Sequence, residues 1–268
     1  MTTRNCVRNI LFILLALLSP LLSAAGQSGN FIIAQNGKAV GTATVTFAAT
    51  AKGYDTNSVV RVAMQGLNYN LSKTEELTSG NQLRHVQLSA VVNNSAVNLA
   101  AAADAAQFLL NVSANGRSST SRLALHSAAV FLPDFDPGAL DTLLALAVNH
   151  NNRDLWAIIP KQSGTQAGTI VPIELATYAD EKGTMDGKPV TVHHLVATMG
   201  GSGMSGSGMD GSRTDIFSGA ENQLMQAELP QQGFAVVRKG FVLTPPAKPG
   251  APPTAQAAQA PAQEPVQH

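Results

Sequence analysis

The sequence predicts a mainly β fold, in which a large curved antiparallel sheet of the half-barrel or meander type surrounds one central helix. Three observations predict this fold. Long segments alternate polar and apolar residues, as residues 42–47 do, which is the period of a half-buried strand. The turn dipeptides Asn36-Gly37, Asn115-Gly116 and Asp186-Gly187 favour tight hairpins. One segment, residues 137–149, instead spaces its leucines as an amphipathic helix does.

The predicted strands follow in order along the chain. A hairpin opens the fold, and the Ala-rich segment 99–110, although helical by propensity, is interpreted as two strands that turn near Asp104. The predicted strands before the helix are 31–35, 39–48, 59–64, 67–77, 82–92, 107–112 and 117–125. Those after it are 155–160, 169–178, 190–198, 214–217, 224–228 and 234–243.

The helix has clear start signals. Asp136 is placed to cap the first free amides, and Pro137 suits the first helical position. Leu140, Leu143 and Leu144 fall on one face, so the helix is expected to bury that face against the sheet.

Residues 1–25 have the features of a secretory signal. Basic residues precede an apolar run at residues 10–22, and Ser23-Ala24-Ala25 supplies the small residues of a cleavage site. The run is too short to cross ~30 Å of hydrocarbon as a helix; an uncleaved anchor is the alternative. We expect cleavage after Ala25, export to the bacterial periplasm and no transmembrane segment in the mature chain. Cleavage also removes Cys6, the only cysteine, which excludes disulfides and Cys-ligated zinc.

The remaining chain is predicted to form one β-rich domain over residues 26–244. Within it, residues 200–211 repeat Gly-Ser-Gly-Met, a composition typical of a flexible loop. Residues 245–268 are rich in Pro, Ala and Gln, which predicts a disordered tail.

Composition excludes several functions. The chain of 268 residues balances 17 Lys and Arg against 17 Asp and Glu, whereas nucleic-acid-binding proteins and proteins that bind anionic membrane surfaces carry a basic excess. We therefore expect no nucleic-acid partner. One Trp and three Tyr are too few for the aromatic girdles of an outer-membrane barrel.

The glycine-rich loop raises two hypotheses about ligands. Residues 201–206 fit the dinucleotide motif G-x-G-x-x-G, but no helical pattern follows, so no cofactor is predicted. Met199, Met204 and Met209 are five residues apart and His193 is nearby, and thioethers select Cu(I). These four residues are the weak metal candidates, and methionines in an unconstrained linker are the competing interpretation.

Few residues point to catalysis, and no catalytic residue is predicted. His126 and His194 are the histidines that an envelope hydrolase would use with the carboxylates Asp134 and Asp136. Capping of the helix already accounts for Asp136, and by strand alternation His194 shares a face with valines. Neither H-E-x-x-H nor G-x-S-x-G occurs in the sequence.

Three parts of the chain carry a resemblance: the opening hairpin at 37–42, the central helix, and the closing segments 215–217, 224–228 and 238–241. Together they resemble uncharacterised exported bacterial β-sheet proteins, and more distantly the lipoprotein-carrier type of unclosed β-barrel. The resemblance implies a curved sheet around a helix and no catalytic residues. The Gly-Ser-Met insertion and the Pro-Ala-Gln tail depart from that pattern.

The leading functional hypothesis is a non-enzymatic binding or carrier domain of the bacterial envelope. Its concave face, with Val86, Leu88, Val190 and Val192 as candidates, would hold an apolar ligand or partner segment. In the alternative, Leu140, Leu143 and Leu144 fill that face, and the protein is a structural or partner-binding envelope protein without a small ligand. An envelope hydrolase and a copper-binding protein are the remaining hypotheses.

Overall fold

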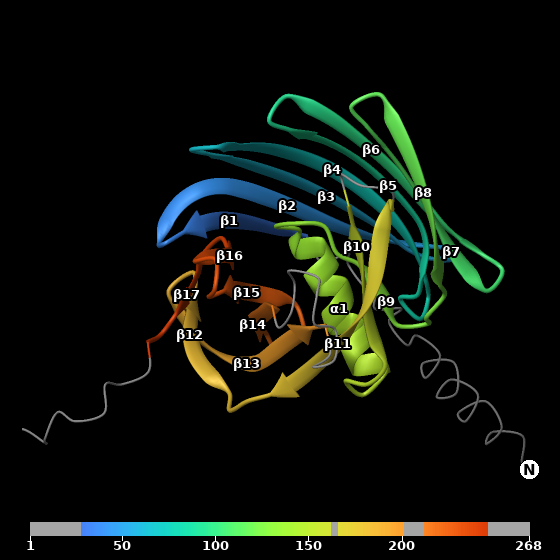
Figure 1. Cartoon of the computed structure of the whole chain (residues 1–268). Coiled ribbons are helices and arrows are strands. Elements are labelled where there is room, and N and C mark those ends of the chain that lie inside the picture. The colour runs from blue at the N-terminus through green and yellow to red at the C-terminus, as the bar shows by residue number, and fades with distance from the viewer. Residues whose placement is uncertain (1–27, 162–165, 201–211, 246–268) are drawn as a thin grey trace, which may run out of the picture.

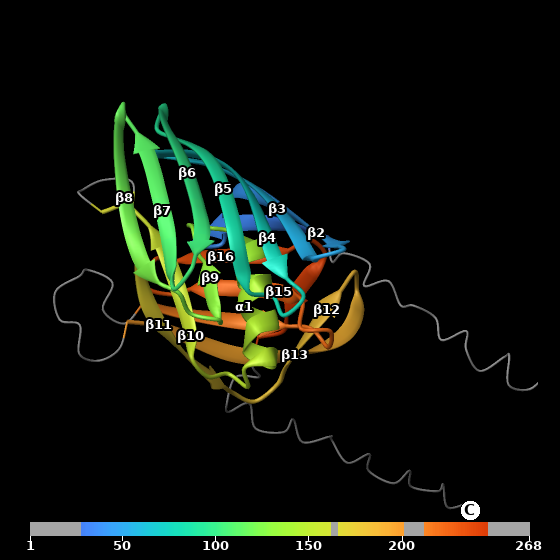
Figure 2. The same cartoon turned by 90° about the vertical axis from the view of Figure 1, so that its right-hand side faces the viewer.

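The computed structural model describes residues 28–161, 166–200 and 212–245. These residues form seventeen strands, which hydrogen-bond into a single curved sheet, and one helix, α1. The sheet bends into an open barrel, and α1 lies between the strands of its first half and those of its second half (Figures 1 and 2). The predicted curved β fold around a central helix is therefore confirmed. The predicted signal, the Gly-Ser-Met loop and the tail lie outside the described residues, apart from Gly200 and Pro245.

The first eight strands form a meander in which each strand pairs antiparallel with the next. Asn36 and Gly37 have positive φ angles of 49° and 78°, as a two-residue hairpin turn requires. The Ala-rich segment forms two strands, as predicted. The strands are β1 (Gly29–Gln35), β2 (Lys38–Thr50), β3 (Gly53–Met64), β4 (Leu67–Thr78), β5 (Leu83–Val92), β6 (Ser95–Asp104), β7 (Gln107–Ala114) and β8 (Arg117–Ala124).

Helix α1 (Pro137–Asn149) begins as predicted. The Asp136 side chain accepts a hydrogen bond from the backbone N–H of Gly138 at 2.9 Å, which satisfies one free amide of the first turn. Gly138 lets the helix approach the sheet, because an added Cβ would lie 2.4 Å from Ser58 Oγ. Ten residues of the helix are buried, more than one face of it, because the barrel surrounds it.

The second half of the chain completes the barrel. Its strands are β9 (Ala129–Phe131), β10 (Leu155–Pro160), β11 (Gly168–Thr177), β12 (Glu181–Met185), β13 (Lys188–Met199), β14 (Ser212–Ser218), β15 (Leu224–Leu229), β16 (Phe234–Arg238) and β17 (Phe241–Leu243). Pairing runs from β9 through β10, β11, β13, β14 and β15 to β16, which pairs with β1. Strand β12 pairs with β17 and with the first part of β13.

Several details differ from the sequence prediction. Strands β9 and β12 were not predicted, and β9 pairs parallel with β10, so the sheet is mixed rather than purely antiparallel. The strand predicted over 234–243 is two strands, because Gly240 takes a φ of 91° between them. Strand β3 begins at Gly53, earlier than its apolar alternation indicated, because it pairs with β2 and β4 along its whole length.

The barrel is not closed by hydrogen bonds between strands. Within the described residues β8 pairs with β7 alone, and β9 pairs with β10 alone. Where β8 comes near the second half of the sheet, the backbone N–H of Ala167 donates to the side-chain Oγ of Ser121 at 2.9 Å. A side chain, rather than a ladder of backbone pairs, thus joins the two halves at this edge.

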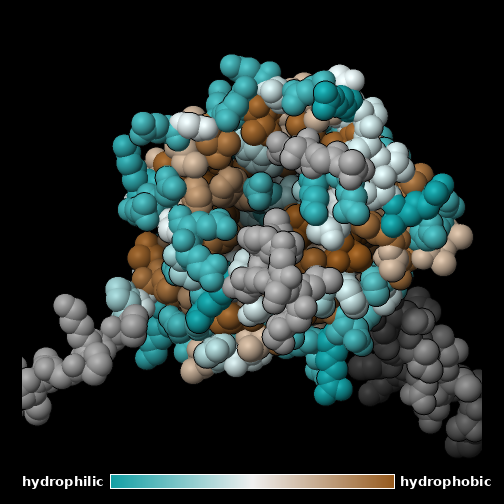
Figure 3. Space-filling model, viewed as in Figure 1, coloured by the Kyte–Doolittle hydropathy of each residue, from teal (hydrophilic) through white to brown (hydrophobic). Residues whose placement is uncertain are grey.

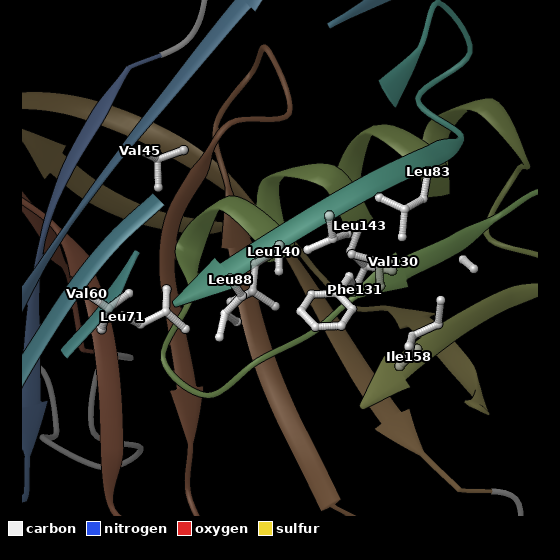
Figure 4. Close-up of a cluster of buried hydrophobic side chains, with 14 of the residues drawn as sticks. Val45, Val60, Leu71, Leu83, Leu88, Val130, Phe131, Leu140, Leu143 and Ile158 are labelled. Carbon is white, nitrogen blue, oxygen red and sulfur yellow. The ribbon is translucent and has the colours of Figure 1, made fainter. Parts of the chain in front are cut away.

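The core consists of two clusters. The larger lies inside the barrel, where Leu140 and Leu143 of α1 pack with Phe131, Leu88 and Leu71 from the surrounding strands (Figure 4). The smaller contains Val192, Phe217, Met225 and Phe241, with Val190 packed against it. Because β13 contributes to both clusters through different residues, it connects the barrel to the β12–β17 pair.

Candidate functional site

A crevice of about 230 Å³ opens at the end of the barrel where β10, β13 and β15 finish and β14 begins. We call it the mouth crevice. Its apolar walls are Leu132, Pro133, Phe135, Leu140, Ile159, Met199, Leu229 and Val236, and its polar walls are Asp134, Asp136, Ser212, Arg213, Thr214, Gln231 and Gln232. Figure 3, in the orientation of Figure 1, shows apolar side chains around hollows at the centre of the view and hydrophilic ones toward the outside.

The segment that leads into α1 shapes this crevice. Phe135 has a positive φ of 59°, an uncommon conformation for a bulky residue. Its ring makes edge contacts with Tyr69 (6.0 Å between centroids) and Phe234 (4.8 Å). These contacts from β4 and β16 fix the segment across the barrel mouth.

One acidic group of the crevice has a shifted pKa. The Asp134 side chain reaches solvent, but the packed chain around it partly desolvates its carboxyl and raises the pKa above the usual value, because loss of water disfavours the charged form. The Tyr69 hydroxyl donates to the backbone carbonyl of Asp134 at 3.5 Å. The crevice therefore offers mostly apolar surface and a carboxyl group that gains a proton more readily than a fully hydrated one does.

A charged network borders the crevice on β13 and β14. Arg213 donates to both carboxylate oxygens of Asp215, at 3.0 Å and 2.6 Å. His194 places Nε2 3.0 Å from Asp215 and Nδ1 3.1 Å from Glu181. Partial burial alone would raise the pKa of Asp215, but the hydrogen bonds from Arg213 and His194 lower it below the usual value.

Beneath the crevice lies a buried ion cluster, formed by Lys73, Glu75 and Asp136, whose side chains have no exposed surface. Lys73 Nζ contacts both carboxylates, at 2.8 Å in the case of Glu75, and Thr56 Oγ1 donates to Glu75 at 2.9 Å. Burial opposes the charge on Lys73, but the two carboxylates outweigh it and raise its pKa. Burial also raises the pKa of Glu75 in spite of Lys73. The cluster joins β4 to the residue that caps α1.

Asp141 joins the other side of the helix to the sheet. Its carboxylate accepts the backbone N–H of Leu224 at 2.6 Å, and burial raises its pKa from 3.8 to about 6. Since the folded pKa lies above the unfolded value, the folded state binds more protons between pH 4 and pH 6. The stability contributed by this group is therefore full below about pH 4 and is lost as the pH rises through about 6.

We expect Asp141→Asn to stabilise the protein at pH 7.5 by up to about 2 kcal/mol. The amide oxygen still accepts from Leu224, and no buried charge remains. Urea unfolding at pH 4 and pH 7.5 checks this, with the exposed Asp104→Asn as the control. An equal effect of Asp141→Asn at both pH values would contradict it.

The residues that the sequence proposed for one apolar concave face lie in two different core clusters. Val86 and Leu88 lie in the larger cluster, whereas Val190 and Val192 lie in or against the smaller one. They do not form one concave face, because β13 leaves the barrel wall at its N-terminal end to pair with β12. Leu140, Leu143 and Leu144 are buried inside the barrel, and the space between β4–β7 and the segment 132–134 is only about 40 Å³.

The metal and hydrolase candidates are not brought together. Met199 lines the mouth crevice, while Met204 and Met209 lie outside the described residues. His193 contacts Asp180 at 2.9 Å, and His126 stacks on Trp156 with 3.9 Å between ring centroids. Within the residues that the structure describes, no group of three His, Cys, Asp or Glu side chains is placed to hold a metal ion.

Sequence reasoning did not single out Lys73, Glu75 or Arg213. A signal for the first two exists in β4, where alternate residues from Tyr69 to Leu77 face inward. Lys73 and Glu75 occupy that inward row between Leu71 and Leu77, so strand parity alone places both charges in the core.

The sequence matches no protein-family model and no curated protein. Among solved structures, the chain is similar to a β-barrel-like protein of the domain of unknown function DUF1849 from Brucella abortus. The TM-score is 0.53 at 11% identity, over 82% of this chain and 98% of that one. A DUF1089 family protein from Pseudomonas aeruginosa has a TM-score of 0.38 at 10% identity, over 71% and 90%.

The Brucella structure shows that this chain shares a β-barrel-like fold with an uncharacterised domain. That similarity concerns the fold alone and does not indicate catalysis. In the described part of the chain, α1 is too short to reach from one side of a membrane to the other.

Proposed function

We propose that this protein is an exported, non-enzymatic binding domain of the bacterial envelope, which holds a short apolar segment of a partner or ligand in the mouth crevice. The observation that supports it is the crevice itself, whose apolar walls come from α1, from the segment before it and from the strands β10, β13, β15 and β16. Such a concave apolar surface with a few polar groups is typical of a binding site. The signal-like residues 1–25 support the proposal of export.

The volume of the crevice limits the size of the ligand that it can hold. Its volume of about 230 Å³ is below the ~300–1,000 Å³ of pockets that enclose a small molecule. In the described part of the barrel, α1 and the leucines that it carries are buried in the interior. The site is therefore suited to one or two apolar side chains, or the end of an acyl chain, rather than to a whole lipid.

A fluorescent apolar probe, N-phenylnaphthylamine, tests this proposal with two variants. Met199→Trp places a large ring in the crevice wall and is expected to weaken probe binding by about tenfold or more, equivalent to ~1.4 kcal/mol. Val148→Trp is the matched control, because Val148 is 59% exposed at the far end of α1.

Two results would contradict the proposal: the wild-type protein does not bind the probe, or Met199→Trp and Val148→Trp weaken probe binding equally. Thermal unfolding of each variant shows whether the fold is retained.

A further inference from the structure

The outward side of strands β4 to β8 carries a second depression, of about 470 Å³, on the opposite face of the sheet from the core. We call it the outer groove. Side chains from all five strands line it, among them Thr74, Gln87, Ser89, Asn98, Asn111 and Thr120. The groove thus crosses the strands rather than running along one of them.

The chemistry of this groove is uniform. Its polar lining side chains are all hydroxyls or primary amides, and none of its lining residues is Asp, Glu, Lys, Arg or His. It also contains no aromatic residue. A charged polymer would find no ion-pair partner there. A protein partner would find none of the Trp, Tyr or Arg residues that dominate protein interfaces.

Two hydrogen bonds orient the amides. Ser89 Oγ donates to Asn98 Oδ1 at 2.8 Å, and Thr120 Oγ1 donates to Asn111 Oδ1 at 2.7 Å. Each amide can still donate from its nitrogen, and each hydroxyl can still accept. The groove therefore presents donors and acceptors that are already held in place before a ligand arrives.

We propose that the outer groove binds a neutral polyhydroxylated ligand, a glycan chain. Sugar hydroxyls both donate and accept, as the side chains of the groove do. Neighbouring strands repeat about every 4.8 Å, close to the length of one pyranose unit in an extended glycan. A chain laid across β4 to β8 thus meets a new set of polar side chains at each unit.

Saturation-transfer NMR with two neutral oligosaccharides, chitohexaose and maltoheptaose, tests the proposal. We expect transfer to at least one of them, with a dissociation constant on the order of 1 mM. The double variant Asn98→Leu, Asn111→Leu is expected to weaken that binding by at least about tenfold. Both positions are exposed, so the fold is expected to persist, and circular dichroism verifies it.

Matched controls separate this site from its surroundings. Asn57→Leu makes the same change on the outward face of β3, beyond the groove, and is expected to leave binding unchanged. Met199→Trp is also expected to leave it unchanged, so that failure of the glycan site is distinguishable from failure of the mouth crevice. No transfer to either oligosaccharide, equal binding by the double variant, or stronger binding of polyglutamate or heparin would overturn the proposal.

Discussion

Lys73→Met is expected to destabilise the folded protein by about 3–5 kcal/mol at pH 7, because it leaves the buried carboxyl groups of Glu75 and Asp136 without their cation. Burial already raises the folded pKa of Glu75, and Lys73 opposes that rise; without the cation the Glu75 pKa rises further above its unfolded value, so the folded state favours protonation of this carboxyl. The loss of stability is then largest near pH 7 and smaller near pH 4. Urea unfolding at the two pH values measures it.

Two further variants complete the experiment. Lys52→Met removes a lysine that is exposed between β2 and β3 and is expected to change stability by less than about 0.5 kcal/mol. Adding Glu75→Leu to Lys73→Met removes one of the stranded carboxyls and is expected to recover part of the loss. A loss below about 1 kcal/mol for Lys73→Met would show that the buried ion cluster does not hold α1 to β4.

Phe131→Ala is expected to lower the free energy of unfolding by about 3–5 kcal/mol. Phe131 lies on β9 with no exposed surface and packs within the larger cluster beside α1 (Figure 4). Removal of the ring leaves a cavity that the surrounding strands can fill only in part. Chemical denaturation measures the effect, and Leu125→Ala, at a position 40% exposed, is the control.

The Phe131 variant also bears on function. If Phe131→Ala lowered the free energy of unfolding no more than Leu125→Ala does, the interior around β9 would be loosely packed. The barrel itself, rather than the mouth crevice, would then be the place to look for an apolar ligand.

Local patterns predicted much of this fold from the sequence. The turns at Asn36-Gly37 and Asn115-Gly116 join the strand pairs that were expected there, whereas the turn at Asp186-Gly187 joins β13 to β12, a strand that was not predicted. Helix α1 begins at the predicted cap. In each case the determining interactions lie within a few residues along the chain, so the local sequence contains them.

The features that escaped prediction depend on distant parts of the chain. Strand β9 has three residues, too few to show a period, and its pairing with β10 brings together segments on either side of α1. Val190 and Val192 alternate as core residues do, but which cluster they join depends on β13 changing partners along its length. The mouth crevice combines residues from six elements that are far apart along the chain, so no local sequence pattern indicates it.

The pairing of β1 with β16 has a consequence for the order of folding. Ser28 and Arg238 are hydrogen-bonded although 210 residues separate them, and β1 lies between β2 and β16 in the sheet. Chains dominated by such distant contacts fold slowly. If the chain crosses a membrane from its N-terminus, β1 to β8 can form hairpins as they emerge, but β1 lacks its second partner until almost the entire chain has followed. One side of the opening strand therefore remains available to other strands for most of that time.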